Sequence, residues 1–205
     1  MSASAALAFF IAGLIGSVPF GLIVTKCLGT VDPRRAGSGN IGATNVLRTS
    51  GWGPGLLTLA GDVFKGALAV SAAPVLAAGG SAPEPALQVT AALGAVLGHI
   101  FSPFSNFRGG KGVATGLGIF ALLMPGPAAW AALVFLGALL GTRYVSVGSI
   151  LGAATVPLAA FLSGYSQEAT ATAALIAALI IWRHTDNIRR LLRGKEHRLG
   201  QKENG

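Results

Sequence analysis

Apolar runs separated by short polar or glycine- and proline-rich breaks recur along the whole 205-residue chain. A helix rises about 1.5 Å per residue, so roughly 20 apolar residues cross the hydrocarbon core of a bilayer. The runs predict helices near residues 3–25, 54–78, 86–102, 112–124, 127–142, 149–163 and 169–183. This pattern indicates an all-α integral membrane protein with seven transmembrane helices.

The distribution of basic residues predicts the orientation of these helices. The breaks at 79–85, 125–127 and 164–168 contain no Lys or Arg. Cytoplasmic loops are enriched in these residues, so the N-terminus is expected outside and the C-terminus in the cytoplasm. The other breaks carry Lys26, Arg34, Arg35, Arg48, Arg108, Lys111 and Arg143, and a basic cytoplasmic tail follows over 183–205.

Composition supports one membrane domain over 1–205, because mean hydropathy is +0.66 and only 11% of residues are charged. The net charge of +8 is explained by topology and by affinity for anionic lipid headgroups, not by nucleic-acid binding. The N-terminal apolar run lacks the basic start and the cleavage site of a signal peptide, which predicts a retained helix. Cys27 is the only cysteine, which excludes an intramolecular disulfide and a cysteine metal cluster.

The stretch FRGGKGVATG, residues 107–116, places Lys111 among glycines. Backbone N–H groups without side chains can approach a phosphate closely, and the ammonium can reach it. The apolar run after it is too short to span a bilayer. Either the helix extends back into the loop, or it is a partial helix whose N-terminus faces a polar cavity. A packing corner of small residues with a snorkelling Lys111 is the alternative.

A second glycine-rich segment, AGSGNIGATNVLR over residues 36–48, is rich in neutral hydrogen-bond donors and has no carboxylate. Such a segment suits an anion. The alternative is a flexible turn in which Thr44 or Asn45 is the N-cap of a short interfacial helix.

Three ionisable residues lie within apolar runs. Asp62 and Lys65 are spaced i, i+3 on one helix face, so that an ion pair is feasible. Isolated charges at mid-bilayer cost roughly 2.5–3.5 kcal/mol each, so the pair has either a structural role or a binding or catalytic one. His99, at the end of the third predicted helix, is a possible general base or a structural residue.

Four separated strings carry a family resemblance: GSGNIGATN, GHIFSPFSNFRGGKGVATG, RYVSVGS and RHTDNIRRLLRGKEHRLG. In order and spacing they resemble the bacterial acyl-phosphate:glycerol-3-phosphate acyltransferase family, PlsY. The resemblance implies a seven-helix membrane enzyme with its active site on the cytoplasmic side. It also implies transfer of the acyl group of a long-chain acyl phosphate to the 1-hydroxyl of sn-glycerol 3-phosphate. The products are lysophosphatidic acid and phosphate, in the first acylation of phospholipid biosynthesis.

This chemistry suits the residues at hand. An acyl phosphate is already activated, so the enzyme is expected to need no covalent nucleophile, metal or other cofactor, only two phosphate sites and an oriented hydroxyl. The His-x-x-x-x-Asp box of soluble-type acyltransferases is absent, because Phe104 and Arg189 stand five residues after His99 and His184. The resemblance suggests that a substrate phosphate assists proton removal, with His99 structural and His184 orienting.

By motif position, the resemblance assigns each functional group to a residue of this chain. His184 and Asn187 are expected to contact glycerol phosphate or the reacting carbonyl. No metal site is expected. The catalytic set is Ser38, Arg48, Lys111, His184 and Asn187. The substrate- and phosphate-binding set is Gly39, Asn40, Thr44, Asn45, Gly109, Gly110, Gly112, Thr115, Arg143, Ser146 and Ser149.

The expected partners are sn-glycerol 3-phosphate, long-chain acyl phosphate and membrane lipid, with functional coupling to the enzyme that makes acyl phosphate from acyl carrier protein. The expected location is the inner membrane, with several passes. A transporter of small anions would show internal repeats and charges near the midplane, and the chain shows no clear repeat. A lipid-binding scaffold would explain the basic tail but not the separate loops rich in phosphate donors.

Overall fold

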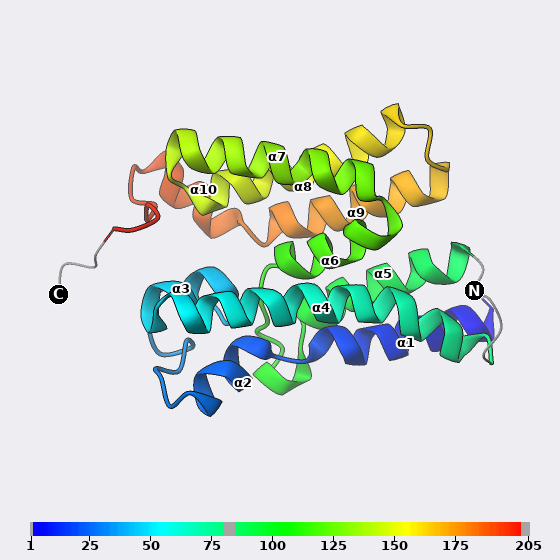
Figure 1. Ribbon diagram of the computed structural model, residues 1–205, viewed down its shortest axis with the longest axis horizontal. Helices are drawn as coiled ribbons and strands as arrows, with labels where there is room; N and C mark the ends of the chain where they lie inside the picture. Colours follow the sequence, from blue (N-terminus) through cyan, green and yellow to red (C-terminus); the bar gives the residue numbers. More distant parts are fainter. Residues whose placement is uncertain (1, 80–84, 202–205) are drawn as a thin grey trace. The chain divides into compact units, whose positions relative to one another are not determined.

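The chain, in a computed structural model, is helical, and no strand occurs in residues 2–79 and 85–201, the ranges that the structure describes (Figure 1). Most of the expected break at 79–85 and the last residues of the expected tail lie outside these ranges. The chain forms two compact units, Met1–Leu123 and Met124–Gly205, which are described separately.

The N-terminal unit is built on α4, which packs against α1 and α5 and also against the short α6. Helix α1 also packs closely along α5 (Figure 1). The elements of the N-terminal unit are α1 (Ala3–Ser17), α2 (Phe20–Cys27), α3 (Ala43–Ser50), α4 (Trp52–Ala77), α5 (Pro85–Ile100), a 3-10 turn η1 (Pro103–Ser105) and α6 (Val113–Leu123).

Glycines bring these helices into backbone contact. A Cβ at Gly16 would collide with the backbone of Ala95, and one at Gly98 would collide with the carbonyl of Gly13. Helix α6 meets α4 in the same way, because a Cβ at Gly66 would collide with Thr115 O. Membrane helices associate through such small-residue contacts, since lipid offers little hydrophobic driving force for their association.

The first predicted helix is broken at Val18–Pro19, which the sequence analysis missed. Pro19 has no backbone N–H and cannot donate the helical hydrogen bond to the residue four positions earlier. Carbonyl groups near the break therefore lose their partners within the helix. Side chains from other elements replace them. Ser102 Oγ donates to Ser17 O at 2.6 Å, and Lys65 Nζ donates to Val18 O at 2.7 Å.

The C-terminal unit is a layer of antiparallel helices in which α8 contacts both α7 and α9 (Figure 1). Its elements are α7 (Pro125–Thr142), α8 (Val145–Leu162), α9 (Gln167–Trp182) and the amphipathic α10 (Thr185–Leu192). The Pro-Gly-Pro sequence predicted as an interhelical break instead forms the first turn of α7. Proline is favoured there because the first helical N–H groups need no intrahelical acceptor.

Five helical segments of the described chain are long and apolar enough to cross a membrane: Ala3–Cys27, Trp52–Ala77, Pro85–Ser105, Pro125–Thr142 and Val145–Leu162. The remaining two predicted helices are the shorter apolar helices α6 and α9. Helix α6 begins at Val113, so it does not extend back into the glycine loop. Its 11 residues rise only about 16 Å.

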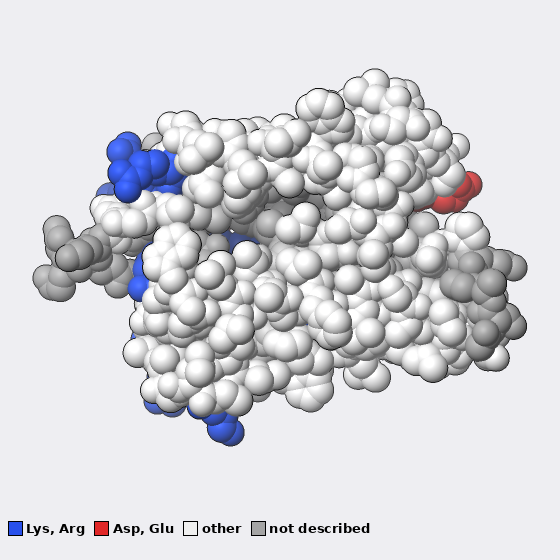
Figure 2. Space-filling model, in the orientation of Figure 1, with Lys and Arg blue, Asp and Glu red and all other residues white. Residues whose placement is uncertain are grey.

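The surface in Figure 2 is almost free of charged side chains along the helix bodies. Lys and Arg appear at the α10 end of the C-terminal unit, and the N-terminal unit shows them at its α2–α3 end. Large apolar side chains are exposed on these helices, among them Phe10, Leu140 and Phe161. Such a surface is suited to lipid, because apolar side chains are stable in contact with acyl chains and charged side chains are not.

Candidate active site

Asn45 organises the first glycine-rich loop. Asn45 is 3% exposed, and its side-chain amide hydrogen bonds to the loop backbone. Oδ1 accepts from Ser38 N at 2.8 Å, and Nδ2 donates to the carbonyls of Pro33 (2.9 Å), Ala36 (3.1 Å) and Asn40 (2.8 Å). Two N–H groups thus serve three acceptors, which fixes the course of residues 33–40. Helix α3 begins at Ala43 with Gly42 as N-cap, so Thr44 and Asn45 lie inside the helix and do not cap it.

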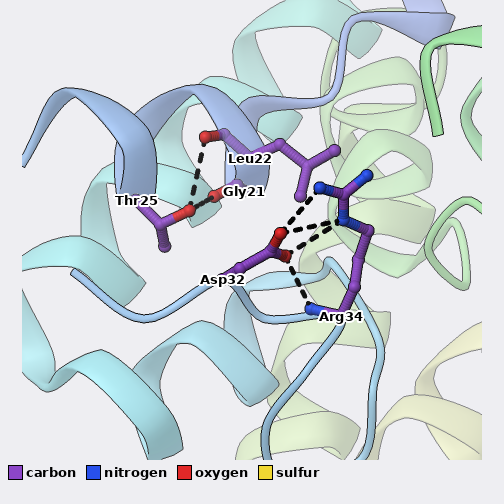
Figure 3. A network of polar contacts seen from close by, with 5 residues as sticks. All are labelled: Gly21, Leu22, Thr25, Asp32 and Arg34. Atoms are coloured by element: carbon purple, nitrogen blue, oxygen red, sulfur yellow. Dashed lines mark hydrogen bonds and ion pairs between the residues drawn. The ribbon is translucent and has the colours of Figure 1, made fainter. Parts of the chain in front are cut away.

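Asp32 and Arg34 form an ion pair at the start of this loop (Figure 3). Arg34 Nη2 and Nε donate to the carboxylate at 2.6 and 3.0 Å, and Arg34 N donates to Oδ1 at 3.0 Å. These hydrogen bonds lower the pKa of Asp32 to about 2. Arg34 therefore has a carboxylate partner at neutral pH. Arg48, the predicted phosphate ligand on α3, forms no ion pair with the residues that the structure describes.

The second glycine-rich loop runs from η1 to α6. Asn106 and Phe107 both have positive φ, 53° and 59°, and reverse the chain after η1. Gly109 N then donates to Ile100 O at 3.0 Å, which ties the loop to the end of α5. Gly112, with φ 88°, leads directly into α6, a backbone angle that side chains disfavour. The N-terminal N–H groups of α6 thus lie next to Lys111.

The two loops meet within the N-terminal unit. Asn40 Oδ1 accepts from Gly42 N at 2.9 Å, and Asn40 Nδ2 lies 3.5 Å from Gly109 O, at the long limit of a hydrogen bond. Gly109 and Gly110 are buried, whereas Lys111 is half-buried. Two segments that the sequence singled out separately, some 70 residues apart, are therefore neighbours.

The predicted site residues of the N-terminal unit differ in how far they are exposed. Ser38 and Gly39 are exposed, and Thr44 and Arg48 are half-buried. Thr115 is fully buried, and its Oγ1 has no hydrogen-bond partner within the described residues. Thr115 O lies at the contact of α4 with α6, where Gly66 leaves room for it. Direct phosphate contacts by these residues stay predictions.

In the C-terminal unit, Glu196 joins two predicted site residues. Its Oε1 accepts from Ser146 Oγ at 2.8 Å and from Asn187 Nδ2 at 2.5 Å, and its Oε2 accepts from Arg190 Nε at 2.7 Å. Burial raises the pKa of Glu196, but the hydrogen bonds from Asn187, Ser146 and Arg190 outweigh burial and lower the pKa overall. The carboxylate thus links α8 to α10.

Sequence reasoning did not single out Glu196, although a carboxylate within a strongly basic tail is the signal that could have found it. Part of the basic tail is hydrogen bonded to Arg143, the residue between α7 and α8. Leu199 N donates to Arg143 O at 2.7 Å, and Arg143 Nη2 donates to Leu199 O at 3.0 Å. An open pocket of about 460 Å³ lies at this turn, lined by Arg143, Tyr144, Gly194, Glu196, Arg198, Gly200 and Gln201.

His184 and Ser149 are buried in the same unit. His184 Nδ1 lies 2.7 Å from Ile180 O, and because a carbonyl can only accept, this ring nitrogen carries a proton. The bond fixes the ring at the start of α10. Ser149 Oγ donates to Val145 O at 2.9 Å, one turn earlier in α8. Contacts of these residues with a substrate stay predictions.

Comparison with known proteins gives a family match over nearly the whole chain. The family model described as glycerol-3-phosphate acyltransferase matches residues 6–194. The chain is 45% identical over 192 residues to a glycerol-3-phosphate acyltransferase of Thermus thermophilus, covering 94% of each chain. It is 46% identical over 190 residues to that of Trichlorobacter lovleyi, covering 92% of this chain and 95% of the relative.

Two crystal structures are similar to the fold. Both are of PlsY (YgiH), described as an integral membrane glycerol 3-phosphate acyltransferase, in a glycerol 3-phosphate form and a lysophosphatidic acid form. Each is 41% identical and covers 96% of both chains, with TM-scores of 0.86 and 0.84. The apolar helices and these structures define an integral membrane protein. The chain belongs to the glycerol-3-phosphate acyltransferase family, PlsY, as its motifs predicted.

Proposed function

We propose that the protein transfers the acyl group of a long-chain acyl phosphate to the 1-hydroxyl of sn-glycerol 3-phosphate. The products are lysophosphatidic acid and inorganic phosphate, and the reaction is the first acylation of phospholipid biosynthesis. Family membership supports the acceptor, since the solved PlsY structures are described in glycerol 3-phosphate and lysophosphatidic acid forms. The acyl-phosphate donor follows from the motif resemblance and from the chemistry of the loops.

The observation that carries the proposal is the meeting of the two glycine-rich loops. Asn40 and Gly109 bring the first loop next to the loop of Lys111, beside the N-terminus of α6. Backbone N–H groups, a lysine and the positive end of a helix are the groups that hold phosphate in proteins. A reaction between two phosphate-bearing substrates needs this kind of surface, because both anions must be held close together against their mutual repulsion.

In the proposed reaction, the 1-hydroxyl oxygen attacks the carbonyl carbon of the acyl phosphate. The bond between that carbon and the bridging oxygen then breaks, and the oxygen leaves with the phosphate. The hydroxyl proton passes to a substrate phosphate, whose second pKa of about 6 suits it to accept a proton near neutral pH. Lys111 and Arg48 neutralise the phosphates, and Ser38 and Gly39 in the first loop and Thr44 in the first turn of α3 contact them.

We assign orienting roles in the C-terminal unit to Ser146 and Asn187, which Glu196 holds, and to His184, whose ring Ile180 O fixes. Arg143 and Ser149 complete the set that the motifs assign. The protein is proposed to be a single acyltransferase domain in the inner membrane, with seven spans, an external N-terminus and a cytoplasmic active site. Functional coupling to the enzyme that produces acyl phosphate is part of the same proposal.

Donor selectivity tests this proposal. Purified protein is supplied with glycerol 3-phosphate and either palmitoyl phosphate, palmitoyl-coenzyme A or palmitoylated acyl carrier protein, and lysophosphatidic acid is quantified. We expect product from palmitoyl phosphate alone. Equal or greater product from either thioester, or none from palmitoyl phosphate, would contradict it.

A further inference from the structure

A buried cluster of ionisable residues lies beneath the Lys111 loop, and the proposed reaction does not use it. It consists of Asp62 and Lys65 on α4 and His99 on α5, which are 3%, 2% and 5% exposed. Lys65 Nζ lies 2.7 Å from Asp62 Oδ1, so the ion pair that the i, i+3 spacing made feasible is formed. Lys65 also donates to Val18 O at the break between α1 and α2. The lysine thus has a structural role of its own.

His99 faces Asp62 with one ring nitrogen. Its Nδ1 lies 3.8 Å from Asp62 Oδ1, which is too long for a hydrogen bond but makes the imidazole and the carboxylate buried neighbours. Asp62 is itself held by the ion pair with Lys65, so the imidazole has a fixed carboxylate beside it on the α4 side.

The other ring nitrogen of His99 faces the glycine loop. A Cβ at Gly110 would collide with His99 Nε2, and one at Gly109 would collide with His99 O. Gly109 N also donates to Ile100 O, the residue after His99. The loop backbone therefore rests directly on the imidazole and on the last turn of α5, and Lys111 is the next residue along the chain.

We propose that His99, oriented by Asp62, is a positioning residue for phosphate binding. Its imidazole supports the backbone of Gly109 and Gly110 and thereby sets where Lys111 and the first N–H groups of α6 meet a phosphate. The ligand chemistry is a phosphate monoester or acyl phosphate, and either substrate can supply it. The inference rests on the proposed function for the identity of the ligand, but the support of the loop is a property of the protein alone.

Three variants separate support of the loop from a general effect on folding. His99→Gln keeps a polar atom near the place of Nε2, under Gly110. His99→Asn keeps one near Nδ1, facing Asp62, and leaves the space under Gly110 empty. Ser102→Ala is the matched control, because it removes a buried hydrogen bond to Ser17 O close to His99 without touching the glycines.

We expect His99→Asn to raise the KM of one substrate by about tenfold or more, since small misplacements of a binding group cost this much, while the KM of the other changes less than about twofold. Varying glycerol 3-phosphate and palmitoyl phosphate separately shows which phosphate the loop holds. His99→Gln is expected to lie close to wild type, with substantial activity. Unchanged KM values for both substrates in His99→Asn, or an equal rise in Ser102→Ala, would overturn the proposal.

A second measurement needs no catalysis and keeps the test valid if the proposed reaction is wrong. Hydrogen–deuterium exchange of the ligand-free protein is compared for residues 109–113 and for the rest of α5 and α6. We expect faster exchange of 109–113 in His99→Asn, with the helices unchanged. Exchange at wild-type rates in 109–113, or faster exchange throughout the N-terminal unit, would show that His99 does not act on the loop specifically.

The collision at Gly110 gives a third test. A methyl group in Gly110→Ala has no space beside the imidazole, so this variant is expected to lose binding of glycerol 3-phosphate or palmitoyl phosphate. Adding His99→Ala provides that space, and binding by the double variant is expected to return to the level of His99→Ala alone. Additive losses in the double variant would contradict direct support of the loop by His99.

Discussion

Replacement of Asn45 by alanine tests whether this residue builds the first loop or touches substrate. The change removes the acceptor of Ser38 N and the donor to the carbonyls of Pro33, Ala36 and Asn40. A hydrogen bond of this kind contributes about 0.5–1.5 kcal/mol net. The two N–H groups and one oxygen of the amide thus stabilise the closed loop by roughly 2–4 kcal/mol.

The expected result is local opening of the loop before any substrate binds. A loss of roughly 2–4 kcal/mol corresponds to about a 30- to 800-fold rise in the open population, at tenfold per 1.4 kcal/mol. Hydrogen–deuterium exchange of residues 33–42 in the substrate-free protein measures this change. Ser38→Ala is the control, because it removes the hydroxyl and keeps the backbone N–H that Asn45 accepts from.

Unchanged exchange in Asn45→Ala, together with loss of activity, would refute this reasoning. Asn45 would then contribute by contact with substrate, as the motif resemblance assigns it. Faster exchange in Ser38→Ala as well would show that the loop depends on contacts other than the amide of Asn45.

Other predictions concern charge, pH and topology. Lys111→Ala is expected to remove about 2–5 kcal/mol of transition-state stabilisation, which lowers kcat/KM roughly 30- to 5,000-fold. Near-normal turnover would favour the alternative that Lys111 belongs to a packing corner of small residues. Lys26→Ala is the control, because Lys26 is exposed. Glu196→Gln is expected to lower the Tm at pH 7. The pKa of Glu196 is lowered in the folded protein, so the carboxylate stabilises the fold fully above the unfolded pKa of 4.5 and loses this effect as pH falls through the folded pKa. The difference in Tm between wild type and Glu196→Gln should therefore shrink in acid. A difference in Tm that stays constant with pH would contradict this. A reporter after Gly205 is expected to read cytoplasmic and one near Ala82 external, and the same side for both would show that the seven-span topology is wrong.

The sequence predicted the helical membrane fold well, because long apolar runs leave the backbone few alternatives in lipid. It also singled out both glycine-rich loops, since glycines around a lysine and a run of neutral donors are unusual in such a chain. The pairing of Asp62 with Lys65 followed from helical spacing alone and is confirmed. These features are local, and local patterns are legible in one sequence.

Features that depend on contacts between distant segments were not predicted. The break at Pro19 looked like continuous apolar sequence, and its carbonyls are satisfied by Lys65 and Ser102 from other elements. Glu196 reaches Ser146 across 50 residues, a separation that no periodicity reveals. The contact of His99 with Gly110 likewise depends on how the chain turns after α5.

The fate of the bridging oxygen tests the central claim most directly. Purified protein is given palmitoyl phosphate labelled with ¹⁸O at the oxygen between carbon and phosphorus, with and without glycerol 3-phosphate, and the products are analysed by mass spectrometry. Acyl transfer breaks the bond to carbon, so the label is expected in the released phosphate, which should equal lysophosphatidic acid in amount and form only with glycerol 3-phosphate present. Phosphate release at the same rate without glycerol 3-phosphate, or label retained in the acyl product, would contradict the account.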